Sequence, residues 1–246
     1  MSGTLEVEVK ADYTNDRYEF RAEPERKMFV LGQQGVVQHG VWMPELARIR
    51  FYRIKDFVEM ANKQLGGLLP PDGRNLVAQL YSSRELRQMV ANYFEGSGWI
   101  LVIKPHEGKL EIQKHQEGVA IGLPFHLSSD TLLRMTFYTV AMESNRDSIL
   151  VFEEPEAHAF PYYTKYLGER IALDENKNQY FIATHNPYLL AAIWEKSPSG
   201  DVAVFATYYR DYETRVRSLT VDEMERLFQS DPFLGVSHLV EDRPCR

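Results

Sequence analysis

The chain has 246 residues, of which 44% are hydrophobic and 12% aromatic, and this allows a sizeable core in one or two domains. Acidic residues outnumber basic ones by 35 to 28, which gives a net charge of −7. This balance argues against a chain that wraps nucleic acid unaided, because neutralising phosphates requires a clustered basic surface. The single cysteine, Cys245, excludes an internal disulfide framework and fits a reducing cytoplasm.

The sequence does not suggest a membrane or secretory protein. The first eight residues lack the basic start and apolar run of a signal peptide. The longest stretches without a charged residue, 28–44 and 178–194, have 17 residues each and contain several polar ones, so neither supplies the roughly 18 to 20 apolar residues that a spanning helix requires. The stretch 118–129 is shorter still. A membrane partner is therefore not expected.

Residues 1–50 are expected to form an antiparallel β region. Apolar and polar residues alternate over 5–10 and 18–21, and 27–31 continue the pattern, which predicts strands with one wet face. The stretch 48–55 spaces its basic residues, Arg48, Arg50, Arg53 and Lys55, between apolar ones. This spacing fits a strand or a helix, and we interpret the cations as a solvated face rather than a nucleic-acid stripe.

Residues 51–126 are expected to be mainly helical, with one short hairpin. Apolar positions recur at three- and four-residue steps and predict helices over 54–65, 75–80 and 83–94. In the last of these, Ser83 can cap the start and Gly96 can stop the end. Two short strands are predicted at 99–103 and 109–113.

Residues 127–246 alternate strands and helices, which predicts an α/β core with parallel crossover connections. The expected helices are one that opens in the cap cluster 127–135 and runs to about residue 143, 155–172, one that opens at Pro187, and 221–228. The expected strands are 148–152, 179–184, 202–207 and 216–219. The strand 148–152 is so apolar that we expect it to be central and covered on both faces, and we expect 179–184 to be a second buried strand.

Two adjacent carboxylates, Glu153 and Glu154, end the first of these apolar strands. Ligands of open α/β sheets bind at the carboxyl ends of strands, so these acids could handle a metal ion and a water. The structural alternative is that Glu154 and Glu156 favour the N-terminus of the next helix through its dipole, with Pro155 at the first helical position.

A histidine ends the second apolar strand, in the segment Thr184-His185-Asn186-Pro187. A single histidine is more often structural than catalytic. The predicted parallel arrangement, however, puts His185 at the same end of a neighbouring strand as the acid pair.

A cluster of capping residues, Ser128, Ser129 and Thr131, opens the helix at 130. These hydroxyls could cap the helix, bind an anion at its N-terminus, or do both in different states.

Together, in this order and spacing, these segments resemble the ABC-type ATPases of the recombination-repair and overcoming-lysogenisation-defect kind. Residues 71–76, Pro-Asp-Gly-Arg-Asn-Leu, look like an element of that family, and 127–132 are similar to its signature. Residues 153–158 are close to its Walker B continuation and 184–187 to its switch segment. The resemblance covers roughly residues 66–190. It implies the α/β sheet of an ABC-type P-loop NTPase, with parallel core strands flanked by helices and an N-terminal antiparallel β-hairpin region.

The resemblance also implies roles and cofactors. Glu153 would help to hold Mg²⁺, Glu154 would act as general base or orient the attacking water, and His185 would contact the γ-phosphate of ATP. The hydroxyl cluster at 128–131 would face ATP held by a second unit of an ATPase dimer. These roles suit phosphoryl transfer, in which catalysis is mostly positioning and charge stabilisation. Nucleic acid is expected only as an indirect partner.

One part of the family pattern is missing from the sequence. No Gly-x-x-x-x-Gly-Lys-Ser/Thr occurs, and the only Gly-Lys pair, at 108–109, is followed by Leu110. That loop and its lysine are what cradle the β- and γ-phosphates. In the family it precedes the region that matches residues 1–31, so we interpret the fold as incomplete. The Walker A loop would come from another polypeptide or from an upstream half of the same ATPase.

A second departure lies in the signature, where Asp130 replaces a glycine that approaches the γ-phosphate. Two unit charges about 4 Å apart repel by roughly 4 kcal/mol at an effective dielectric near 20. A helix N-terminus returns only about 0.3 to 2 kcal/mol. The alternative function is therefore a degenerate regulatory or assembly module without hydrolysis.

A third reading comes from a different class, a metal hydrolase that uses Glu154, Glu156 and His158. On a helix, residues two positions apart point in different directions, so this spacing does not form one face.

Overall fold

The computed structural model describes residues 48–54, 62–210 and 212–229, together with the backbone of four strands between residues 6 and 40. These strands pair in chain order as an antiparallel sheet: β1 (Glu6–Asp12), β2 (Arg17–Glu23), β3 (Lys27–Leu31) and β4 (Val37–Gly40). Within the described residues, no helix is both long and apolar enough to cross a membrane.

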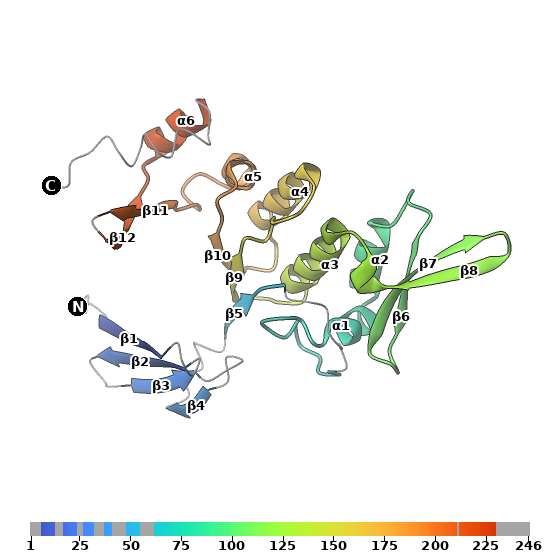
Figure 1. The fold of residues 1–246 in the computed structure, drawn as a ribbon. Coiled ribbons are helices and arrows are strands. Elements are labelled where there is room, and N and C mark those ends of the chain that lie inside the picture. Colours follow the sequence, from blue (N-terminus) through green and yellow to red (C-terminus); the bar gives the residue numbers. More distant parts are fainter. Residues whose placement is uncertain are drawn as a thin grey trace.

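A three-stranded parallel sheet carries the segments of interest (Figure 1). Its strands are β5 (Ile49–Tyr52), β9 (Ile149–Glu153) and β10 (Gln179–Ala183), with β9 in the centre. Both pairings are parallel. The prediction that the strands ending at the acid pair and at the histidine are parallel neighbours is thus confirmed. The partner on the other side, β5, comes from a part of the chain about 100 residues away.

The described residues cover one face of this sheet and leave the other largely exposed. Tyr52, Leu150 and Phe152 are fully buried, whereas Ile49 and Phe51 of β5 are 44% and 42% exposed and Phe181 of β10 is 54% exposed. β9 is central, as expected, but the expected burial on both faces is not found, since Phe181 of β10 and the β5 residues beside β9 are exposed on the second face. Side chains alternate between the faces of a strand, and the core packs against the face that carries Tyr52 and Phe152.

The helix α3 (Asp130–Glu143) packs on the covered face. Its Tyr138 meets Phe152 edge to face, with ring centroids 4.9 Å apart, and its Phe137 meets Tyr52 at 6.0 Å. As predicted, this helix opens within the serine cluster: it begins at residue 130, and the side chain of Ser129 accepts a hydrogen bond from the backbone N–H of Leu132.

The next helix, α4 (Pro161–Ala172), begins six residues later than predicted. Residues 155–158 form turns instead. His158 adopts a left-handed backbone conformation, with φ of 58°, which a helix cannot contain. Glu154 and Glu156 are therefore not at a helix N-terminus, and the explanation of these acids by a helix dipole is wrong.

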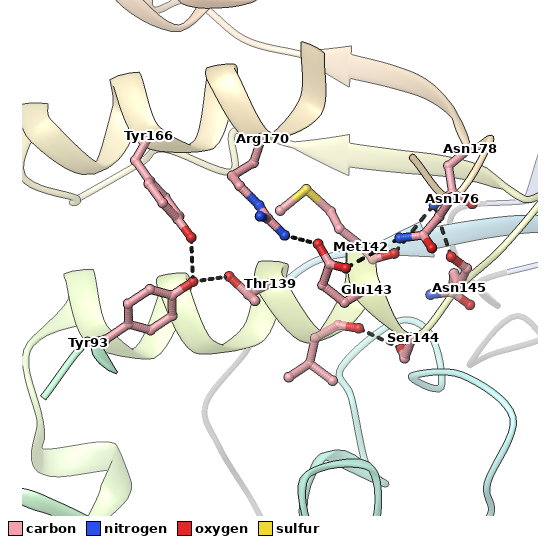
Figure 2. Close-up of polar contacts among 11 residues, drawn as sticks. Tyr93, Thr139, Met142, Glu143, Ser144, Asn145, Tyr166, Arg170, Asn176 and Asn178 are labelled. Atoms are coloured by element: carbon pink, nitrogen blue, oxygen red, sulfur yellow. Dashed lines mark hydrogen bonds and ion pairs between the residues drawn. The ribbon is translucent and has the colours of Figure 1, made fainter. Parts of the chain in front are cut away.

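Polar contacts tie α3 to its neighbours (Figure 2). The hydroxyl of Tyr93 lies 2.7 Å from that of Thr139 on α3 and 2.9 Å from that of Tyr166 on α4. At the C-terminal end of α3, Glu143 pairs with Arg170 of α4, and other contacts reach the loop before β10.

The remaining elements lie on either side of this core. Before it come α1 (Leu76–Ser82), α2 (Arg84–Asn92) and an antiparallel sheet of β6 (Ile100–Lys104), β7 (Lys109–Gln116) and β8 (Val119–Pro124), followed by the short 3-10 helix Phe125–Leu127. Ser83 caps α2 as predicted, whereas β8 was not predicted. Residues 55–61 of the predicted helix 54–65 lie outside the described residues, and 62–65 are not helical.

After β10 come α5 (Pro187–Lys196), the strands β11 (Phe205–Arg210) and β12 (Glu213–Ser218), and α6 (Val221–Gln229). The last two strands pair with each other and are antiparallel. The parallel connections predicted for the C-terminal half are therefore found at β9 and β10 but not at this hairpin.

Candidate functional site

The strands β9 and β10 end side by side at one edge of the parallel sheet. Glu153 is in register with Ala183, so the next residues of both strands leave the sheet at adjacent points. The Nδ1 atom of His185 lies 3.0 Å from Oε1 of Glu154. The structure thus brings together Glu153, Glu154 and His185, as the sequence predicts, while their chemical roles stay predictions.

Both members of this pair are open to solvent, since the side chains of His185 and Glu154 are 78% and 49% exposed. Glu154 nevertheless has a constrained backbone, with φ of 41°. A left-handed conformation costs a residue other than glycine on the order of 1–3 kcal/mol unless neighbours stabilise it. Its N–H donates to the carbonyl of Ala183 at 2.8 Å, and Arg134 of α3 reaches its carbonyl at 3.4 Å. Contacts from β10 and α3 therefore hold the residue in this conformation.

Glu153 has a cationic partner that the sequence did not reveal. Nε of Arg53, the first residue after β5, lies 3.3 Å from Oε2 of Glu153. Arg53 was interpreted as part of a solvated face, and it is indeed half exposed, but it also reaches the acid edge. An exposed pair of this kind contributes at most about 1 kcal/mol, so Glu153 is free to exchange partners.

The hydroxyl cluster at the start of α3 makes contacts of its own. Ser129 caps α3, and Oγ1 of Thr131 accepts a hydrogen bond from the backbone N–H of Phe160 at 3.0 Å. The hydroxyl of Ser128 is buried and has no hydrogen-bond partner among the described residues. None of the three forms a hydrogen bond with the acid pair or with His185 in the part of the chain that the structure describes. The capping role is thus observed, and anion binding stays a prediction.

Glu156 lies behind this edge and is 4% exposed. Its Oε1 accepts a hydrogen bond from the hydroxyl of Thr184, which in turn accepts one from the backbone N–H of Asn186 at 2.9 Å. Over the described ranges, no group of three or more His, Cys, Asp and Glu side chains could hold a metal ion. The hydrolase reading that needs Glu156 as a ligand therefore has no support in the geometry.

Asn75, the asparagine of the Pro-Asp-Gly-Arg-Asn-Leu segment, is fully buried and structural. Its Oδ1 accepts from the N–H of Leu69 at 2.7 Å, and its Nδ2 donates to the carbonyls of Gln64 and Gly67 at 2.8 and 2.9 Å. This part of the family-like pattern closes the loop 64–69 and does not approach the acid edge through these bonds.

Comparison with known families identifies the class of this domain. A family model described as "AAA domain, putative AbiEii toxin, Type IV TA system" matches residues 48–191, which is more than half of the chain. The matched range contains the parallel sheet, α3, α4 and the acid and histidine edge. The class is thus that of AAA-type domains with an α/β fold, and the chain belongs to this family.

Solved structures with a similar fold are heads of SMC ATPases. One comes from work on the ATP-driven dimerization and DNA-stimulated activation of SMC ATPases; the match has 14% identity and a TM-score of 0.43 and covers 70% of this chain and 96% of that one. An Smc head bound to the C-terminal winged-helix domain of ScpA has 11% identity and a TM-score of 0.46, over 84% and 76% of the two chains.

A third match, the Smc head domain of Pyrococcus furiosus with an extended coiled coil, has 14% identity and a TM-score of 0.39. It covers 58% of this chain, but this chain spans only 37% of that one. Among curated proteins, none matches the sequence.

Proposed function

We propose that this chain is an ATP-binding and ATP-hydrolysing subunit or segment of an ABC-like ATPase. Glu153 helps to hold Mg²⁺, Glu154 orients or deprotonates the attacking water, and His185 contacts the γ-phosphate. The observation that carries the proposal is the 3.0 Å pair of His185 and Glu154, next to Glu153, at the carboxyl edge of two parallel strands. Membership of the AAA domain family supports the same class of activity.

The donors at this edge suit the proposed chemistry. Mg²⁺ in phosphoryl-transfer sites takes one or two carboxylates and completes its shell with phosphate oxygens and water. Glu153 offers such a carboxylate, 42% exposed and paired with Arg53 among the described residues. Bound Mg²⁺ would neutralise charge that develops on the phosphates. Glu154 and His185 lie where a water and a phosphate oxygen can reach them, because both side chains are open to solvent.

The phosphate-gripping loop is proposed to come from a segment outside these 246 residues, either another polypeptide or an upstream part of the same ATPase. The uncovered face of the parallel sheet supports this. Phe51, Val151 and Phe181 form one row across the three strands, and strands of parallel sheets are normally covered on both faces. The next row on that face contains Glu153. A strand-loop-helix unit that lays its helix there would bring its loop to the acid edge.

The proposal includes a dimer of ATPase units in which the start of α3 faces a nucleotide of the second unit. Ser129 and Thr131 already serve the helix cap and the backbone of Phe160. A hydroxyl contact to a phosphate there would therefore require one of these hydrogen bonds to be exchanged.

The test completes the chain with a Walker A segment, coexpressed from a neighbouring reading frame or fused upstream, and measures Mg²⁺-dependent phosphate release. Hydrolysis should appear, and Glu154→Gln should lower it at least about 100-fold, the usual contribution of a general base, while nucleotide stays bound. The matched control is Glu111→Gln, which removes a carboxylate paired with Lys104 on the antiparallel sheet and should leave the rate unchanged. Undiminished turnover in Glu154→Gln would reject its assignment.

A second candidate function, a degenerate regulatory or assembly module, is favoured by Asp130 in the first turn of α3. A carboxylate there would repel a γ-phosphate. This alternative predicts that no pairing with a Walker A segment gives Mg²⁺-dependent hydrolysis. It also predicts that Asp130→Gly does not restore hydrolysis, whereas an active site hindered only by this charge would gain activity from that change.

A further inference from the structure

Glu156 is a buried acid that the proposed chemistry does not use. At 4% exposure, it is one of two buried carboxylates among the residues whose side chains the structure describes. A charged group is rarely buried unless hydrogen bonds or an opposite charge compensate it. Oε1 accepts the hydroxyl of Thr184, and Oε2 is buried without a partner among the described residues. The carboxylate therefore has one defined partner, and that partner precedes His185.

Thr184 links Glu156 to the backbone turn that carries His185. Its hydroxyl donates to Glu156 and accepts from the N–H of Asn186, which closes a local turn around His185. The side chain of Asn186 then caps α5 by accepting from the N–H of Tyr188 at 2.9 Å. The backbone on both sides of His185 is therefore fixed by hydrogen bonds.

Two links between β9 and β10 thus flank the exposed pair. The first is the 2.8 Å hydrogen bond from the N–H of Glu154 to the carbonyl of Ala183. The second joins the side chains of Glu156 and Thr184. The imidazole of His185 is 78% exposed, so packing cannot hold it, and its position must come from the backbone turn that these links define.

We propose that Glu156 is a positioning residue, which holds Thr184 and thereby sets the imidazole of His185 against Glu154. The effect of Glu156 on hydrolysis rests on the proposed function. The contact between His185 and Glu154 that Glu156 maintains, however, is present without nucleotide. Thr184 is a positioning residue as well. Among the hydrogen bonds of the described residues, its hydroxyl makes the only one between the side chain of Glu156 and the turn around His185.

The first test measures which ring nitrogen of His185 carries the proton, by ¹⁵N NMR of the full chain without nucleotide. A carboxylate can only accept, so the pair with Glu154 keeps the proton on Nδ1. Glu156→Ala and Thr184→Val should abolish this tautomer preference. Glu156→Gln, whose carbonyl can still accept, and Thr184→Ser should retain it. Glu111→Gln is the control on another sheet.

An unchanged ring spectrum in folded Glu156→Ala and Thr184→Val would overturn the proposal, and so would a Glu156→Gln variant that behaves like Glu156→Ala. If Glu156→Ala does not fold, as its amide spectrum would show, Thr184→Val breaks the same link by a change of nearly constant volume and decides the question.

The second test uses the completed ATPase. Glu156→Ala should lower kcat about 10- to 100-fold, as expected for a misplaced group, with the KM for ATP changed less than about twofold, and Glu156→Gln should restore most of kcat. An equal loss of kcat in both variants would contradict the positioning role. If the wild-type complex does not hydrolyse ATP, the proposed function fails, whereas the NMR result still decides the role of Glu156.

Discussion

Nδ1 of His185 lies 3.0 Å from Oε1 of Glu154, so side chains from two adjacent parallel strands form one hydrogen-bonded unit. Because the carboxylate only accepts, Nδ1 is the donor in this pair, and Nε2 is the ring nitrogen left to meet a phosphate oxygen, to which it donates only when the ring carries both protons. Nδ1 is therefore expected to bind Glu154 and Nε2 to bind phosphate. Substituting His185 with asparagine or glutamine can distinguish these two roles, because their amides differ in reach. An asparagine amide reaches about as far as Nδ1, and a glutamine amide about as far as Nε2.

In the completed ATPase, His185→Gln should retain more activity than His185→Asn, because glutamine can still donate to a phosphate oxygen from the position of Nε2. Complete removal in His185→Ala should lower kcat about 100-fold, which is typical for the loss of one donor to developing negative charge. Steady-state kinetics of the three variants measure this order. Higher activity in His185→Asn than in His185→Gln would instead mean that His185 acts by orienting Glu154.

The pair of Arg53 and Glu153 gives a prediction about Mg²⁺. Arg53→Gln removes a guanidinium that competes for the carboxylate, so half-saturation should occur at a lower Mg²⁺ concentration. The change should not exceed about fivefold, because an exposed pair contributes at most about 1 kcal/mol. Titration of hydrolysis with Mg²⁺ measures it.

Arg48→Gln is the matched control for this prediction, because Arg48 pairs with Asp147 at the opposite end of the same strands. Its Mg²⁺ dependence should equal that of the wild type. A loss of kcat in Arg53→Gln at saturating Mg²⁺ would contradict simple competition and point to a contact between Arg53 and the phosphates.

Local signals in the sequence predicted the elements that carry the site. The apolar runs before Glu153 and Thr184 form β9 and β10, the cap residue Ser129 opens α3, and Pro187 opens α5. The predicted start of α4 was wrong because Pro155 and Pro161 are equally good first residues for a helix. The turn at residues 155–158, with its left-handed His158, separates them and leaves no clear mark in the sequence.

Contacts between residues far apart in the chain could not be predicted from the sequence. Arg53 reaches the acid edge only because β5 pairs with β9 across about 100 residues, and Glu156 meets Thr184 only because β10 lies on the other side. Composition marked the parallel strands as apolar, but it does not say what covers them. Phe181 of β10 is therefore exposed, although the sequence predicted a buried strand, and Phe51 of β5 is exposed in the same row.

Tyr138 gives a prediction about stability. Its hydroxyl is buried and has no hydrogen-bond partner in the described part of the chain, and burial raises its pKa, so the group stays neutral. Tyr138→Phe removes an unsatisfied polar atom and should leave the free energy of unfolding unchanged or raise it by up to about 1 kcal/mol. Tyr93→Phe, which loses the bonds to Thr139 and Tyr166, should lower it by about 1 kcal/mol. Urea unfolding compares the two.

Glu223 gives a prediction about pH. The N–H of Thr220, bonded to this carboxylate at 2.9 Å, holds the pKa of Glu223 at about 2, below its usual value of 4.5, and Arg217 contributes. Because the pKa is lowered in the folded state, the stabilisation is fully present above about pH 4.5 and is lost as the pH falls toward 2.

Glu223→Gln should therefore speed amide hydrogen exchange in α6 at neutral pH, and its difference from the wild type should shrink below about pH 4. The loss at neutral pH should be near 1 kcal/mol, as for other helix caps. Asp222→Asn, in the same first turn, is the control, with a smaller effect. A difference that stays constant down to pH 2 would contradict the assignment.

Gly168 of α4 allows the close packing of α4 on α5, the helix that starts two residues after His185. A Cβ at Gly168 would lie 2.6 Å from Cβ of Ala192 and 3.2 Å from the carbonyl oxygen of Leu189. Elsewhere in a helix, glycine to alanine gains about 1 kcal/mol. Here, overpacking should cost about 1–3 kcal/mol and leave Gly168→Ala less stable than the wild type.

The double variant Gly168→Ala with Ala192→Gly identifies the cause. It moves the methyl group from one helix to the other, so it should regain most of the lost stability in urea unfolding, and the two changes should be strongly non-additive. Additive losses would mean that the helices do not meet at this pair. Because α5 follows the turn of His185 directly, Gly168→Ala should also shift the ring resonances of that histidine, and the double variant should return them toward their wild-type positions.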